Sequence, residues 1–450
     1  VQAKFIDLAA APVGALPGFA GITGSFDAAE GSARIVLATR KGELNLPRVF
    51  PQPRVALDFV NGLVEWERQG ESGYLLRLTS LTFSNAHFSG NAHGTYAAAV
   101  SGPGSIDLSV QFNRADAAHV ARYLPHARLM GGEAVRDWLA RGVLAGHSSD
   151  VRVRIRGDLA EFPFADPSRG QFMVTARIER GALDYAQGWP RIEDIEGELV
   201  FEGRRMRIAG RTGRIQGVEL AKVEAGIPIL GAPEALLQVS GEAHGATADF
   251  LSFIQASPVR RMGAGITDAM SASGYGKLDL RLELPLKDPS RTRVDGGYEF
   301  TDNDLQVHAQ LPPLERASGK LRFTESGVGV SALQGRLFGG AVALSGGTQP
   351  DGSTRIQAKG EATVAATVAA TRVLSDHPWR RYLAGGFAYT ATIGVAIFLL
   401  LPGPIFYATF LDSTLLSATL ILWFFWSLWR FGRGEAVSLE LVAAAILLFF

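Results

Sequence analysis

The amino-acid sequence predicts a mainly β protein: an antiparallel sheet of repeated β-hairpin units, with a few short helices and C-terminal transmembrane helices. Three observations support this fold class. Apolar residues alternate with polar ones along most of the chain, which is the period of a strand. Glycine is frequent, at 52 of 450 residues, and is spread along the chain as many tight turns require. One short phrase recurs with a fixed internal spacing.

Composition excludes several classes of function. The chain carries 44 Lys and Arg against 44 Asp and Glu, so its formal charge of zero gives no attraction to nucleic acid. It has no cysteine, which rules out disulfides and thiolate metal sites, and its 8 histidines are never at close metal-ligand spacing. We therefore expect no metal and no cofactor. The chain starts at Val1 and stops inside an apolar run, which predicts a piece of a longer protein.

Alternation is clearest in residues 276–286, where a leucine follows each charged residue. One face of this strand is aliphatic and the other is charged, as in an antiparallel sheet with one dry face and one wet face. Residues 106–112, 151–156 and 172–178 follow the same pattern. The side chains that we assign to the apolar face are Leu278, Leu280, Leu282, Leu284, Val151, Val153, Ile155, Leu108 and Val110.

The pattern divides the chain into four regions. Residues 1–114 and 148–380 have the strand period, 115–147 form a helical insertion, and 381–450 form a hydrophobic tail. The insertion has apolar residues at helical spacing in two places, which predicts two short helices, the first capped by Asp116.

A further short helix is expected within the second strand region, near residues 247–256. Phe250, Leu251 and Ile254 form a helical stripe that ends before Pro258. In a sheet-rich protein, helices of this kind usually cover an open end of the sheet. Both helical segments are therefore candidates for covers.

The tail differs sharply from the rest of the chain. Residues 382–411 contain no charged residue, a second uncharged run covers 413–429, and a third begins at Leu441. The first two runs are long enough for transmembrane helices, although a buried apolar hairpin is an alternative. Placing 1–380 outside the membrane would put Arg430 and Arg433 outside as well, against the positive-inside tendency. A frameshifted or foreign tail is therefore a second alternative.

The recurring phrase joins a proline to a glycine seven residues later. Its copies run from Pro17 to Gly24, from Pro190 to Gly197 and from Pro312 to Gly319. Each copy has an apolar or small residue two before the glycine and a large apolar residue two after it. A proline without an N–H suits the start of a strand, and the glycine permits a turn or bulge. We interpret the phrase as one repeated strand unit.

This phrase resembles the repeat of AsmA-like proteins. The similarity is carried by residues 311–323 and 333–346. The sequence around Tyr123, the segment Val135–Leu139 and the run 156–164 more narrowly resemble the YhdP group, a set of large members of that family. The similarity covers about residues 1–394, and the apolar tail beyond it does not match.

The resemblance implies an elongated sheet that curls into a hydrophobic groove and conducts phospholipids between the inner and outer membranes of Gram-negative bacteria. It also implies anchorage in the inner membrane, with residues 1–380 in the periplasm and phospholipid acyl chains as partners. Alternation alone slightly favours a closed sandwich, whose leucines face a second sheet, over an open groove. In that case the protein would be an envelope scaffold that binds protein partners.

Catalytic motifs are missing from the sequence. It has no G-x-S-x-G, H-E-x-x-H or P-loop pattern. Ser375, Asp376 and His377 are adjacent in sequence, and neighbours cannot adopt the geometry of a catalytic triad. His87 and His93 are expected to be surface residues. We therefore expect no enzyme activity and no catalytic residue.

Overall fold

The protein is described by a computed structural model. The structure describes residues 1–14, 17–70, 73–98, 101–129, 132–262, 266–307, 312–337, 339–351 and 353–360. The predicted transmembrane tail lies outside these residues. Within them, no helix is both long and apolar enough to cross a membrane.

Antiparallel strands form most of the described chain. The strands are β1 (Gln2–Ala10), β2 (Gly18–Ala29), β3 (Ser32–Asn45), β4 (Arg54–Gln69), β5 (Gly73–Ser84), β6 (Phe88–Ala98), β7 (Ser105–Asp116), β8 (Val143–Ser148), β9 (Val151–Asp158), β10 (Gly170–Leu183), β11 (Ile192–Glu202), β12 (Arg205–Ile215), β13 (Val218–Ile227), β14 (Leu236–Ala246), β15 (Ser271–Ala272), β16 (Tyr275–Pro285), β17 (Arg293–Gln306), β18 (Leu314–Thr324), β19 (Gly327–Leu337), β20 (Gly340–Thr348) and β21 (Thr354–Gly360). The α-helices are α1 (Glu133–Gly142), α2 (Thr247–Gln255) and α3 (Val259–Met262), and the 3-10 helices are Ala117–Tyr123, Ala127–Leu129, Leu159–Glu161, Ile266–Ala269 and Pro289–Arg291.

All 21 strands belong to one sheet, in which neighbours in sequence are neighbours in space. Two positions in the sheet are each filled by an interrupted strand. Both β8 and β9 pair with β7 and β10, and both β15 and β16 pair with β17. The mainly β, antiparallel prediction is therefore confirmed. Among the described residues every strand lies in this sheet, so they contain no second sheet of the kind that a closed sandwich needs.

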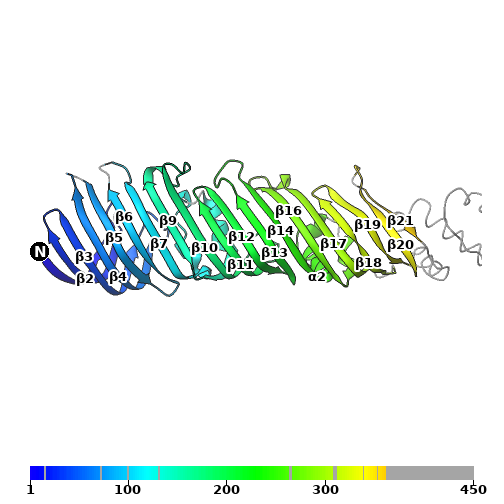
Figure 1. Cartoon of the computed structure of the whole chain (residues 1–450), viewed down its shortest axis with the longest axis horizontal. Coiled ribbons are helices and arrows are strands. Elements are labelled where there is room, and N and C mark those ends of the chain that lie inside the picture. The colour runs from blue at the N-terminus through cyan, green and yellow to red at the C-terminus, as the bar shows by residue number, and fades with distance from the viewer. Residues whose placement is uncertain are drawn as a thin grey trace, which may run out of the picture.

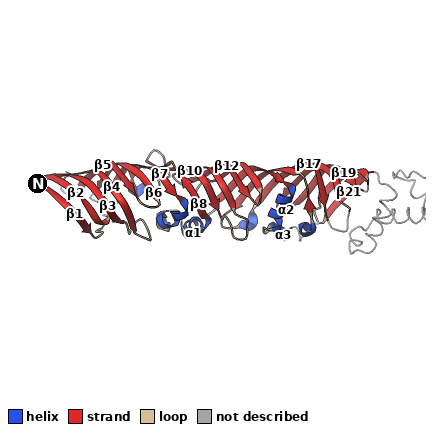
Figure 2. Cartoon of the chain, turned by 90° about the horizontal axis from the view of Figure 1, so that it is seen from below, coloured by secondary structure: helices blue, strands red, loops and turns tan. Residues whose placement is uncertain are grey.

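The helices α1, α2 and α3 lie along one side of the sheet (Figure 1, Figure 2). One helical segment connects β7 to β8, and the other connects β14 to β15. Because the strands alternate in direction, β7 and β14 both end at the same edge. Asp116 caps the first segment, where its side chain accepts a hydrogen bond from the Ala118 N–H at 3.0 Å.

The recurring proline–glycine phrase is a β-bulge. In every copy, the residue four positions after the proline has a left-handed backbone, with φ of 71° at Gly21, 52° at Asp194 and 49° at Arg316. The strand pairing shifts register at each of these places. A bulge bends its strand and increases the local twist. The bulge therefore lies three residues before the glycine that we expected to form it.

The preceding strand also has a bulge beside each copy. One hydrogen bond joins that bulge to a side chain of the phrase. The polar residue six positions after the proline accepts the backbone N–H of a residue that is itself left-handed. The pairs are Asp7 N with Thr23 Oγ1 at 3.3 Å, Arg180 N with Glu196 Oε1 at 3.0 Å, and Asp302 N with Ser318 Oγ at 2.9 Å. The repeat is therefore a device for pairing bulges on adjacent strands.

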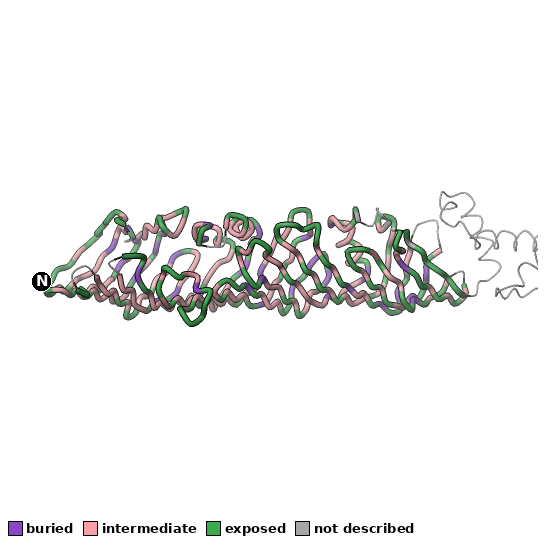
Figure 3. Tube along the Cα trace, turned by 90° about the horizontal axis from the view of Figure 1, so that it is seen from above, coloured by how far each residue is buried: buried purple, intermediate pink, exposed green. Residues whose placement is uncertain are grey.

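The glycine of the phrase allows two strands to approach closely. A Cβ at Gly24 would lie 2.2 Å from the Val36 carbonyl oxygen, and one at Gly319 would lie 2.8 Å from the Leu333 Cα. Paired bulges bend successive strands in the same sense, and side chains on the inside of such a bend are crowded. Figure 3 shows the resulting long, curled sheet.

We expect Ser318→Ala to loosen the bulge at Asp302, because the substitution removes the acceptor of its N–H. The expected loss is about 1 kcal/mol, a typical net value for one hydrogen bond. Faster hydrogen exchange at the Asp302 amide would measure it. Ser345→Ala, at an exposed position of β20, is the matched control and should leave that exchange rate unchanged.

Candidate functional site: the apolar inner face

The nine residues predicted for the apolar side share one face of the sheet. Residues directly opposite each other on paired strands point to the same face. Leu108 is paired with Ile155, and Val110 with Val153. A continuous series of paired residues links the two predicted groups: Val151, Ala176, Leu199, Ile208, Ala225, Val239 and Leu282. We call this side of the sheet the inner face.

The nine predicted side chains of the inner face are half-buried. All nine predicted residues have intermediate exposure, whereas the charged residues between the leucines, Asp279, Arg281 and Glu283, are exposed. No second sheet among the described residues accounts for this burial. The burial instead arises from the curl of the sheet, from neighbouring inner-face side chains and from the helical segments. The inner face therefore keeps apolar surface accessible at these nine positions.

Three fully buried clusters are spaced along this face. They consist of Val55, Leu57 and Val60; of Ile215, Val218 and Ala243; and of Phe300, Leu314, Ala317 and Leu333. Tyr123 packs against the first cluster, and Phe250, Phe253 and Leu278 pack against the second. None of the predicted residues of β7 and β9 belongs to a cluster or its surrounding shell. The inner face is therefore covered in places and uncovered between them.

A polar clamp holds α2 over the second cluster. The Asn303 amide Nδ2 donates to Thr247 Oγ1 at 2.5 Å, and Thr247 Oγ1 lies 2.8 Å from the Tyr298 hydroxyl. The Tyr298 ring also meets Phe250 edge-on, with centroids 5.0 Å apart. Burial raises the pKa of Tyr298, an effect that the Thr247 hydrogen bond partly offsets. The clamp therefore fixes the first turn of α2 to β17.

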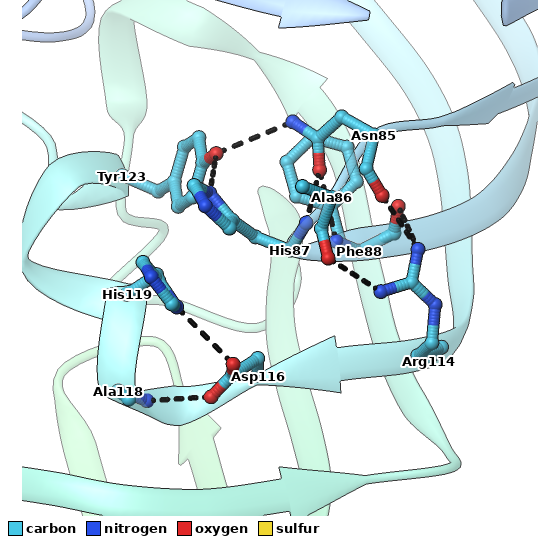
Figure 4. A network of polar contacts seen from close by, with 9 residues as sticks. All are labelled: Asn85, Ala86, His87, Phe88, Arg114, Asp116, Ala118, His119 and Tyr123. Atoms are coloured by element: carbon cyan, nitrogen blue, oxygen red, sulfur yellow. Dashed lines mark hydrogen bonds and ion pairs between the residues drawn. The ribbon is translucent and has the colours of Figure 1, made fainter. Parts of the chain in front are cut away.

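A second polar clamp holds the Ala117–Tyr123 segment over the first buried apolar cluster, that of Val55, Leu57 and Val60 (Figure 4). The Asn85 amide donates to the Tyr123 hydroxyl at 3.2 Å, and that hydroxyl lies 2.6 Å from His87 Nδ1. The His87 ring stacks on the His119 ring, with centroids 3.8 Å apart and planes 10° apart. His119 Nδ1 lies 3.1 Å from Asp116 Oδ2.

Sequence reasoning missed both clamps. His87, which we expected at the surface, lies in the second polar clamp, where it contacts Tyr123. His93 lies elsewhere, on β6. Asn85 is 38 residues and His87 is 36 residues from Tyr123 in sequence, so no local pattern marks these contacts. One signal was present: the helical segments themselves, which contain aromatic residues at the positions that reach the sheet.

The outer face is charged and carries networks of ion pairs. Glu242 lies between two lysines, 3.0 Å from Lys222 Nζ and 3.2 Å from Lys277 Nζ. Hydrogen bonds from these lysines lower the pKa of Glu242. Arg154 similarly forms an ion pair with Asp107 and lowers the pKa of that carboxyl. The sheet therefore separates a charged outer surface from an apolar inner one.

Within the described residues, no group of three or more His, Asp or Glu side chains could hold a metal ion.

A comparison with protein-family models matches residues 1–415 to the family described as YhdP protein. The match continues beyond residue 394, where we expected the similarity to end, and includes the uncharged run 382–411. Searches of curated proteins and of solved structures found no match.

Proposed function

Because the chain belongs to the YhdP protein family, we propose that it conducts phospholipids along its inner face without chemical change. In this proposal the curled sheet is a groove, acyl chains lie on the inner face, and head groups stay in water at the open side. The proposal places residues 1–380 in the periplasm and anchors the protein in the inner membrane. By supplying phospholipid, the protein would support the permeability barrier of the outer membrane. It requires no catalytic group.

The observation that carries the proposal is the continuity of half-buried apolar residues across paired strands, from Leu108 to Leu284. Burying one CH₂ group contributes about 0.8 kcal/mol, so a ten-carbon stretch gains roughly 8 kcal/mol. This gain offsets the cost of removing a lipid from a bilayer. Since similar side chains recur along the sheet, the gain is similar at successive positions, and a lipid can slide without a deep trap.

The size of the sheet also suits an acyl chain. A strand of about nine residues spans roughly 30 Å at about 3.3 Å per residue. One inner face therefore has room for a complete acyl chain along or across its strands.

Native mass spectrometry of the purified full chain, followed by lipid extraction, tests the proposal. We expect phospholipids of mixed head group to co-purify. The proposal relies on apolar contacts between the inner face and the acyl chains, and such contacts do not distinguish head groups. A well-folded, lipid-free protein would contradict it. In that case the alternative, an envelope scaffold that binds protein partners, becomes the better explanation.

A further inference from the structure

We propose that Asn85, His87 and Tyr123 form a proton-sensitive latch, which holds the Ala117–Tyr123 segment on the inner face at neutral pH and releases it in acid. This inference rests on the proposed function, since the latch would control access of lipid to the first buried cluster. Its physical basis is independent of lipid, because it concerns only the contacts between the segment and the sheet.

The hydrogen bonds of the latch determine where the protons lie. Asn85 Oδ1 accepts the backbone N–H groups of His87 and Phe88, each at 2.9 Å, which fixes the orientation of the amide. Asn85 Nδ2 therefore faces Ala56 O and the Tyr123 hydroxyl, and donates to both. The hydroxyl accepts from Asn85, and His87 Nδ1, 2.6 Å away, is the acceptor that the described residues offer for its own proton, so we assign that proton to the bond with His87.

It follows that His87 is neutral in the latched state and that Nδ1 is its unprotonated nitrogen. Acid adds a proton at that atom. The Tyr123 hydroxyl then loses its acceptor and has to turn its proton elsewhere, within a partly buried site. A buried donor without a partner costs about 1–3 kcal/mol. Protonation therefore opposes the contact that holds Tyr123 on the sheet.

The surroundings of His87 also disfavour a positive charge. Burial is the largest cause that lowers the pKa of His87 below 6.5, and positive neighbours add to it. The titratable and charged groups around this ring, from the Ala117–Tyr123 segment, its cap and β7, are His119, Arg122, Asp116, Arg114 and Tyr123. Asp116 alone among them favours the cation, and it is already paired with the Nδ1 of the stacked His119.

The sign of the pH effect follows from this lowered pKa. The released state, with His87 in water, binds a proton more readily than the latched state does. The ratio of released to latched molecules therefore rises as pH falls below about 6.5, by at most about tenfold per pH unit for one proton. Above that pH the ratio is constant, because His87 is neutral in both states.

Spin labels provide a direct test, because the chain has no cysteine of its own. Ala118→Cys and Asp58→Cys introduce labels at exposed positions on the segment and on β4. In the full chain, electron–electron distances should lengthen and broaden between pH 7.5 and 5.5. Adding His87→Gln, which cannot be protonated, should abolish the change, whereas His93→Gln on β6 should preserve it. An unchanged distance in the parent chain, or the same change in His87→Gln, overturns the latch.

Two further measurements keep the test decisive. Tyr123→Phe retains the ring but removes the hydroxyl, so its released fraction should be raised already at pH 7.5; a wild-type distance at that pH counts against the latch. A photo-crosslinker at Leu81, beside the first cluster, should capture more lipid at pH 5.5, while one at Leu282 should not. Absence of lipid at both positions, with a pH-dependent distance, would overturn lipid conduction and leave the latch standing. Equal capture at both pH values, with a fixed distance, would overturn only the latch.

Discussion

Replacing Leu280 and Leu282 together by aspartate is expected to abolish lipid crosslinking at neighbouring inner-face positions. Both leucines are half-buried on β16, opposite Gly241 and Val239 of β14. An ionised carboxylate has to keep its water, so an acyl chain cannot cross it without a large desolvation cost. Two aspartates on the inner face of β16 would therefore interrupt the apolar path at that strand.

The matched control lies between these two leucines. Arg281→Asp also introduces a negative charge into β16, but on the exposed outer face. We expect at least a tenfold loss of lipid-linked photoproduct in Leu280→Asp/Leu282→Asp and less than a twofold change in Arg281→Asp. Equal capture in the double variant would mean that lipid does not pass over these leucines. Circular dichroism of both variants checks that the strand content is retained.

The second large effect is expected from Gly319→Val in the third copy of the repeat. A Cβ at this position would lie 2.8 Å from the backbone Cα of Leu333, which cannot move without shifting β19. Overpacking of this kind typically costs about 1–3 kcal/mol. Because a repeat-built sheet is stabilised mainly by neighbouring units, the loss should be local. Faster hydrogen exchange in β18 and β19 would measure it.

Gly329→Val, on the adjacent strand, is the control for this substitution. The nearest atom to a Cβ at Gly329 is the Arg322 carbonyl oxygen, at 3.9 Å, which is ordinary contact. Valine also suits a strand better than glycine does. We therefore expect unchanged or slower exchange in Gly329→Val. Similar exchange in both variants would show that close strand approach is not the reason for the glycine of the repeat.

Local period was enough to predict much of the fold and of the inner face. The leucines of β16 and the apolar residues of β7 and β9 were assigned to one side from alternation alone, and cross-strand pairing places them on one face. The proline–glycine spacing likewise predicted a repeated unit. Such features depend on backbone geometry over two to ten residues, which the order of side chains reveals directly.

Other features depended on contacts between distant segments. Alternation shows that a strand has a dry face but not what covers it, so the sequence left an open groove and a closed sandwich undecided. The single sheet follows from the pairing of each strand, or of each interrupted strand, with its neighbours along the chain. The position of each bulge, three residues before the expected glycine, follows from register shifts that a single strand does not reveal.

The strand period, the apolar side of each strand and the repeated unit are therefore evident from the order of residues alone. The bend of the sheet, the places where helices cover it, and the contacts of Asn85 and His87 with Tyr123 become evident only in the fold. The two groups of features differ in the range of the interactions that set them. Side-chain direction alternates by local geometry, whereas curvature and long-range contacts depend on register, and register is set jointly by bulges and turns on many strands.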